Sequence, residues 1–245
     1  MAKSHIALYR SLHSLKMEKF KFFDEVITVD QRNTSFVLQD RTTGKIRPQE
    51  LRDHYELVSM FTLNEEVPER VQSHFNTAKN ALLYTWFFYG FYPIAELQAL
   101  SALELALRER IGKEGLKQLK KKKKNIGIQT FIEYAVENEW IRNEDFSAYH
   151  IAPKERARMD YLIRKIKEMN VNGLDSIEIN YREVEVPVEN TTNFLEILMN
   201  TIHKVRNIHA HGNTMLLPAS VWKTFEICRD FINALFREHD DQSDS

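Results

Sequence analysis

The segment from Val71 to Ile111 constrains the fold of this chain more than any other part of the sequence. Its apolar residues recur at helical spacing, and at about 100° per residue several of them share one face. The residues on that face are Leu97, Leu100, Leu103, Leu107 and Ile111. Gly90 and Pro93 interrupt the segment, because proline lacks the amide donor that a helix interior needs. We therefore expect a kinked or split helical spine that ends near Gly112 and Gly115.

Further helices are expected on both sides of this spine. Apolar periodicity indicates helices at 128–141 and 153–169, and weaker patterns at 6–16 and 49–61. Pro218 opens a last helix, because proline is favoured at the first helical position. The expected core stripe of that helix is Val221, Trp222, Phe225, Cys228, Phe231, Ile232 and Leu235.

Two regions have the composition of strands. Near the N-terminus, Val26–Val29 and Ser35–Leu38 are β-prone, and residues 42–45 supply a turn, so this region predicts a small hairpin. Residues 176–188 alternate apolar and polar side chains and predict a short two-stranded excursion. The expected fold is therefore mainly α. It comprises an N-terminal α+β appendage at 1–66, a helical domain at 67–240 and a frayed tail at 241–245.

Charge and cysteine content narrow the class of protein. The 34 basic and 35 acidic residues nearly cancel, so a nucleic acid would be held by a local basic patch and not by the overall field. A single cysteine, Cys228, excludes an internal disulfide framework and fits a reducing compartment such as the cytoplasm. No signal-peptide pattern opens the chain. The apolar run 81–95 is interrupted and shorter than the roughly 20 residues that a membrane span needs, so no membrane partner is expected.

The helix before the last one carries an unusual polar face. Asn190, Thr191 and Thr192 supply capping residues for this helix, which should run to about 209–211 and end at Gly212. With Val205 at the middle of the apolar face, the opposite face is polar. Its residues are His203, Arg206, Asn207, Ala210 and His211. An i,i+4 spacing lets the amide of Asn207 touch the imidazole of His211 and fix its orientation.

The hexapeptide Arg206-Asn207-Ile208-His209-Ala210-His211 resembles the Arg-x(4–6)-His motif of the HEPN superfamily. The likeness extends in architecture over about residues 68–240, because HEPN domains are helical bundles with this motif on a late helix. It implies a metal-independent endoribonuclease that leaves a 2′,3′-cyclic phosphate and a 5′-hydroxyl. It also implies a homodimer in which two motifs face each other, and a toxin or phage-defence effector with an antitoxin or regulatory protein.

Each motif residue suits a step of that reaction. The imidazole of His211 exchanges protons near neutral pH, and the guanidinium of Arg206 stabilises charge on the phosphoryl oxygens. Asn207 would orient His211 or contact the phosphate. We expect no cofactor.

Three other interpretations of the motif remain open. Arg206 and His211 could simply cap the C-terminal end of the helix, where cations are favoured. The domain could be a noncatalytic HEPN-like module that binds a nucleotide, RNA or protein. His203, His209 and His211 could ligate a metal ion, but helical phase separates His209 from the other two and no carboxylate or cysteine lies near them in sequence. We therefore expect no metal.

Charged residues outside the motif supply candidates for support. Glu96 and Glu104 fall within the apolar face of the spine, so one of them should pair with Arg206 or orient a motif side chain, and Glu104 is the preferred candidate. A structural ion pair with another basic residue is the alternative. His203 is a second possible supporting residue. The run Lys120, Lys121, Lys122, Lys123 and Lys124 is either a solvated helix end or, if RNA binds, its phosphate-binding patch.

Overall fold

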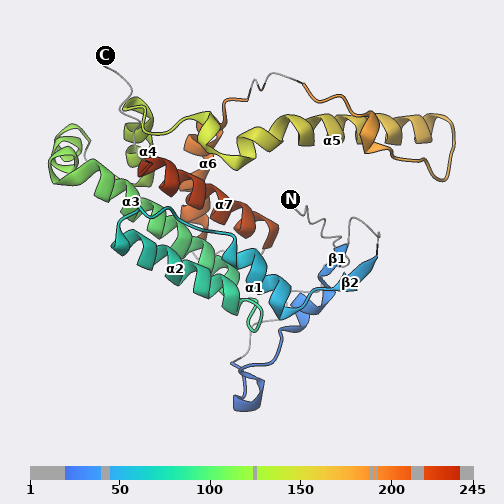
Figure 1. The fold of residues 1–245 in the computed structure, drawn as a ribbon, viewed down its shortest axis with the longest axis horizontal. Coiled ribbons are helices and arrows are strands. Elements are labelled where there is room, and N and C mark those ends of the chain that lie inside the picture. The colour runs from blue at the N-terminus through green and yellow to red at the C-terminus, as the bar shows by residue number, and fades with distance from the viewer. Residues whose placement is uncertain are drawn as a thin grey trace.

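The computed structural model describes residues 20–39, 45–123, 126–187, 190, 192–210 and 218–237, without the side chains of 203 and 206–210. This part of the chain is mainly α, as expected (Figure 1). The helices are α1 (Leu51–Ser59), α2 (Glu69–Tyr84), α3 (Phe91–Lys122), α4 (Ile128–Glu137), α5 (Ser147–Val171), α6 (Phe194–Ala210) and α7 (Pro218–Leu235). Short 3-10 turns lie at Phe23–Glu25, Gln31–Ser35, Asn143–Asp145 and Tyr181–Glu183.

The long helix α3 is the centre of the bundle. It packs against α2 and α7, and α4 and α6 also contact it. The face of α3 predicted from its periodicity is buried at Leu100, Leu103 and Leu107. Opposite this face, α7 contributes Phe225 and Phe231, which are fully buried. The predicted stripe of α7 is thus confirmed, with Trp222 packed at its margin.

The spine splits into two helices near Gly90 and Pro93, as predicted. Helix α2 ends at Tyr84 and α3 begins at Phe91, and the intervening corner is fastened from the N-terminal region. The Asn33 amide donates to the carbonyl oxygens of Thr85 and Trp86, at 2.7 and 2.9 Å. The Asp30 carboxylate accepts from the amide of Tyr89 at 3.0 Å.

The predicted end of the spine is only partly correct. Gly112 does interrupt the helix, with a φ of 70° that side chains larger than hydrogen disfavour. Helix α3 nevertheless resumes and continues to Lys122, past Gly115. The reason is packing, because Leu119 beyond the kink is buried in the common core.

The N-terminal region forms a hairpin, and one of its two strands overlaps the β-prone stretch predicted at Ser35–Leu38. Strand β1 (Val37–Gln39) pairs antiparallel with β2 (Ile46–Pro48), and Leu38 lies opposite Arg47. The predicted strand at Val26–Val29 is wrong, because this stretch follows a 3-10 helix as turn and bend. The turn predicted at 42–45 lies outside the described residues except for Lys45, as do the helix predicted at 6–16 and the tail at 241–245.

Helix α1 occupies the centre of the predicted segment 49–61 and packs on α2. Val58, Phe61 and Val67 belong to the same buried cluster as the spine. The chain segment around α1, which we assigned to an appendage, therefore shares its core with the helical domain.

Helix α5 and residues 172–187, together called the arm here, extend away from the bundle (Figure 1). The helix begins at Ser147, earlier than the predicted 153, and residues 172–187 run back beside it. The expected two-stranded excursion is wrong for the described residues 176–187, which contain a 3-10 turn and otherwise irregular backbone. Tyr161 and Tyr181 join the two parts of the arm, with ring centroids 6.2 Å apart.

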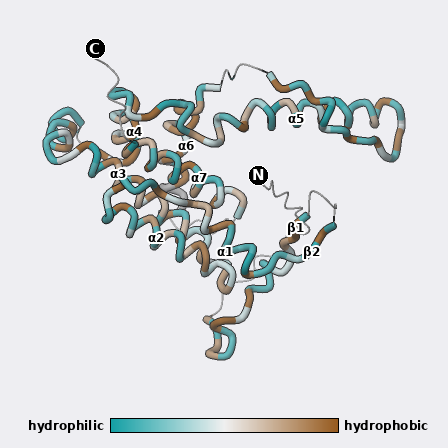
Figure 2. The backbone as a smooth tube through the Cα atoms, in the orientation of Figure 1, coloured by the Kyte–Doolittle hydropathy of each residue, from teal (hydrophilic) through white to brown (hydrophobic). Residues whose placement is uncertain are grey.

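Polar and apolar residues alternate along the bundle helices (Figure 2). Among the described residues, no helix combines the length and apolar content needed to cross a membrane.

Candidate functional site

Helix α6, which carries the motif, is anchored at its N-terminal end. The Asn193 side chain accepts a hydrogen bond from the Glu196 amide at 3.2 Å, as an N-cap residue does. The capping residue is thus Asn193, one position after the predicted 190–192. Asn143, from the 3-10 turn after α4, accepts from the Leu195 amide at 2.9 Å. These bonds satisfy amides that the first helical turn leaves without partners.

The apolar face of α6 is the predicted one. Leu198 and Ile202 are buried, and Phe194 and Val205 pack at the edge of the core. Leu195 is buried as well. Through this face α6 contacts α3 and α4, so the bundle fixes the helix on which the motif begins.

The motif itself lies at the limit of what the structure describes. Arg206 and Asn207 belong to α6, whose helical backbone continues to Ala210, but their side chains, like that of His203, are outside the description. His211 and the expected terminating residue Gly212 lie outside the described residues. The structure therefore gives the position of the helix but not the arrangement of the Arg206, Asn207 and His211 side chains.

Glu96 is buried, as its helical phase predicted, with an exposed fraction of 1%. Its carboxylate accepts a 2.5 Å hydrogen bond from the Thr224 hydroxyl of α7. This contact joins the two central helices of the bundle. A buried carboxylate needs such donors, because moving a charged group out of water costs free energy that hydrogen bonds inside the protein must offset.

Glu104 has a partner within its own helix. Its carboxylate accepts from Nη2 of Arg108 at 3.1 Å, an i,i+4 ion pair. The guanidinium of Arg108 also lies over the ring of Phe131 in α4, 4.9 Å from its centroid. The described contact is the structural ion pair that we weighed as the alternative to a contact with Arg206.

The lysine run continues α3 to its C-terminal end. Lys120, Lys121 and Lys122 are exposed in the last turn, where cations interact favourably with the helix dipole. Lys123 donates to Glu133 of α4 at 2.6 Å. Lys124 lies outside the described residues. Because α4 in turn packs on α6, the basic end of α3 and the motif helix adjoin the same short helix.

His54 is a buried titratable residue that we did not select from the sequence. Its Nε2 lies 3.0 Å from the carbonyl oxygen of Leu82, and its ring lies between Trp86 and Trp222. Burial lowers the pKa of this imidazole, while the neighbouring backbone carbonyl groups partly oppose that shift. The only signal in the sequence was its place on the inner face of a short amphipathic helix.

Nucleophilic and metal chemistry have little support elsewhere. Cys228 is fully buried, and burial, with the nearby charge of Glu96, raises the pKa of its thiol far above neutrality. Within the described ranges, no three His, Cys, Asp or Glu side chains gather in a metal-binding group. The imidazole rings of His203, His209 and His211 are not among the described side chains.

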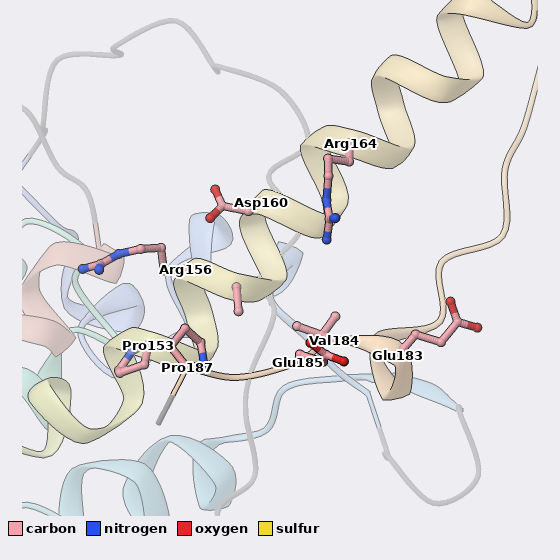
Figure 3. A pocket seen from close by; sticks show the side chains of 9 residues that line it. Pro153, Arg156, Asp160, Arg164, Glu183, Val184, Glu185 and Pro187 are labelled. Carbon is pink, nitrogen blue, oxygen red and sulfur yellow. The ribbon is translucent and has the colours of Figure 1, made fainter. Parts of the chain in front are cut away.

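A cleft of about 620 Å³ lies on the arm, between α5 and residues 183–187. Its walls include Arg156, Asp160 and Arg164 (Figure 3). The carboxylates of Asp160 and Glu183 point in different directions and do not converge. Asp160 and Glu183 thus do not form the paired groups of an acid–base site. Sequence analysis missed the cleft because it exists only where residues 183–187 fold back on α5.

No family model, curated protein or solved structure matches this chain. The functional assignment therefore depends on the motif, on the helix that carries it and on the charges nearby.

Proposed function

We propose that this protein is a metal-independent endoribonuclease of the HEPN type, with Arg206, Asn207 and His211 at its active site. The observation that carries the proposal is the Arg206-x(4)-His211 spacing at the end of α6, a helix whose opposite face is buried in the bundle. Capping alone would account for a cation at the helix end, but not for an amide and an imidazole at i,i+4 beside it.

The proposed reaction is an in-line displacement at phosphorus. The RNA 2′-oxygen forms a bond to the adjacent phosphorus atom, and the bond from phosphorus to the 5′-oxygen of the next nucleotide breaks. One imidazole accepts the 2′-hydroxyl proton and another donates a proton to the departing 5′-oxygen. His211 of each copy in a homodimer supplies these two groups, and Arg206 stabilises the charge on the phosphoryl oxygens.

The lysine run would hold the RNA backbone beside the site. Lys120, Lys121 and Lys122 have exposed side chains, and the end of α3 adjoins α4, on which α6 packs. Each phosphate that a lysine neutralises releases counterions, so binding would be sensitive to salt. In a cell, we propose that this activity belongs to a cytoplasmic toxin or phage-defence effector, restrained by an antitoxin or regulatory protein.

Cleavage of a labelled RNA by the purified chain tests the proposal. We expect cleavage to persist in EDTA, to yield 2′,3′-cyclic phosphate ends, and to fail when the scissile nucleotide is 2′-deoxy. His211→Ala should slow it by about 10²–10⁴-fold, the usual contribution of a proton-transfer residue. His150→Ala is the matched control, because His150 is an exposed histidine far from the motif in sequence.

RNA binding measured beside cleavage separates an enzyme from a binding module. His211→Ala should leave affinity nearly unchanged, while Arg206→Ala should lower both affinity and rate, because a guanidinium also contacts the ground-state phosphate. Tight binding with no cleavage by the wild-type chain would instead favour the noncatalytic module. If EDTA abolished cleavage and zinc or manganese restored it, the result would favour the alternative in which the histidines ligate a metal ion.

A further inference from the structure

The arm carries an apolar stripe that nothing in the described structure covers. Met159, Ile163 and Ile166 of α5 have exposed fractions of 55%, 44% and 42%. At about 100° per residue they lie within about 60° of one another. Tyr161, which faces the returning chain, is buried and donates to Glu183 at 3.2 Å. The stripe therefore lies on a different side of α5 from residues 172–187.

The bundle does not support this part of α5. Among the described residues, the side-chain hydrogen bonds, ion pairs and ring contacts of α5 beyond Arg156 are all made within the arm. Figure 1 shows the helix extending outward from the bundle. A helix gains most of its stability in proteins from packing of an apolar face, so an uncovered stripe along a protruding helix indicates a binding surface.

We infer that the stripe binds the same stripe of a second copy of this chain, with the two α5 helices antiparallel about a two-fold axis near Ile163. The spacing suits this arrangement. Ile163 then lies against Ile163 of the second copy, and Met159 lies near Ile166 of the second copy on both sides of the axis. An isologous contact of this kind repeats each interaction twice.

Charge complementarity favours a second copy over other occupants. Asp160 and Lys167 lie on one flank of the stripe, and no ion pair is described for either of them. They are seven residues, about 10 Å, apart along the helix, too far to pair with each other. In the antiparallel arrangement each Asp160 lies beside Lys167 of the other copy. An anionic membrane would attract the lysine but repel the aspartate.

This contact is separate from the one that the proposed function requires. It uses the middle of α5 and not the end of α6, and it needs no RNA. It would join chains through their arms whether or not the motif is catalytic.

Disulfide trapping tests the contact directly. The only natural cysteine, Cys228, is fully buried, so Ile163→Cys introduces a single reactive thiol. Under mild oxidation we expect most of the Ile163→Cys protein to migrate as a covalent dimer on a nonreducing gel. Val171→Cys is the control, because Val171 is 85% exposed but lies eight residues from the axis, which separates its two copies by about 24 Å.

A charge exchange tests the register. Asp160→Lys alone and Lys167→Asp alone should each weaken association by about tenfold, since each places like charges opposite one another at two symmetric positions. The double variant should restore wild-type association, measured by sedimentation. Restoration is expected only if these two residues meet across an interface.

Several results would overturn the inference. One is crosslinking of Ile163→Cys no greater than that of Val171→Cys, even if light scattering shows a dimer, because such a dimer would use another surface. Another is a wild-type chain whose stripe binds anionic vesicles and not a second copy. RNA cleavage by His211→Ala at the wild-type rate, with crosslinking of Ile163→Cys still observed, would overturn the proposed function alone, so the two hypotheses fail separately.

Discussion

Glu96 and Thr224 form a polar contact between the two central helices of the bundle. The carboxylate is 1% exposed, and the Thr224 hydroxyl is its described donor. Thr224→Val keeps the shape of the side chain but removes that donor. We expect the free energy of unfolding to fall by about 1–3 kcal/mol, the usual cost of a lost partner for a buried polar group.

Urea unfolding of the two proteins measures this difference. Thr201→Val is the control, because the Thr201 hydroxyl bonds only to the backbone of its own helix and the residue is exposed. Equal effects of the two substitutions would show that the buried carboxylate does not depend on Thr224.

His54 should make stability depend on pH. Burial lowers the pKa of this imidazole in the folded protein, whereas the unfolded value is near 6.5. Below about pH 6.5 the unfolded chain therefore binds more protons than the folded one, and the free energy of unfolding falls as the pH falls. Above that pH the contribution is constant. Its described neighbours, Leu82, Thr85, Trp86 and Trp222, carry no charge that could hold the protonated ring.

Unfolding at about pH 7.5 and 5.5 tests this dependence. His54→Gln keeps an amide donor for the Leu82 carbonyl but does not titrate, so this variant should lose less stability on acidification than the wild type. His150→Gln should behave as the wild type does, since His150 is exposed. A wild-type chain whose stability does not change between the two pH values would contradict the assignment.

For individual residues, helical periodicity in the sequence predicted which side chains are buried better than it predicted which residues they contact. The burial of Glu96 follows from its place among leucines, but its partner Thr224 is 128 residues away and only the packing of α3 on α7 brings the two together. For the same reason His54 escaped notice, because its burial depends on Trp86 and Trp222. The positions of Arg206 and Asn207 on α6 followed from periodicity, whereas their contacts remain predictions.

Among the elements, helices were predicted better than strands. Long periodic segments such as α3 and α7 fix their own inner face, so a local pattern is sufficient. Strand propensity depends on what a segment packs against. Val26–Val29 is β-prone but forms no strand, whereas Ile46–Pro48 pairs with β1 despite a proline. The alternation at 176–187 likewise reflects a chain lying along α5 and not a hairpin.

The basic end of α3 should control RNA affinity without controlling chemistry. Replacing Lys120, Lys121 and Lys122 with Gln removes three exposed charges. If each contacts one phosphate of single-stranded RNA, the slope of log affinity against log salt should become shallower by about 2. Filter binding across a salt series measures this slope, and single-turnover cleavage at saturating protein should stay near wild type.

Lys223→Gln is the matched control for the lysine variant. Lys223 lies on α7 and pairs with Glu226 at 2.8 Å, so its loss should leave the slope unchanged. An unchanged slope in the triple variant would identify the lysine run as a solvated helix end and place the RNA path elsewhere.

For the whole molecule, the main question is whether the N-terminal region and the helical domain unfold together. Phe61 follows α1, yet it lies in the core of the bundle, with its ring centroid 5.8 Å from Trp222 and 5.4 Å from Phe225, both on α7. The contact joins the segment after α1 to the last helix of the described chain. The sequence separates these regions because residues 26–47 are β-prone and a helical pattern begins at Pro68. Neither local pattern shows which residues far apart in the chain come into contact.

Phe61→Ala tests this shared core. The side chain is 7% exposed, and truncating a buried phenylalanine costs about 3–5 kcal/mol through lost burial and the cavity left behind. We expect one cooperative unfolding transition, displaced to lower urea concentration, whether followed by helical circular dichroism or by tryptophan fluorescence. Phe22→Ala should change the free energy of unfolding by less than about 0.5 kcal/mol, because Phe22 is 74% exposed. Two separate transitions, with only the smaller displaced by Phe61→Ala, would show instead that residues up to 66 form an independent unit.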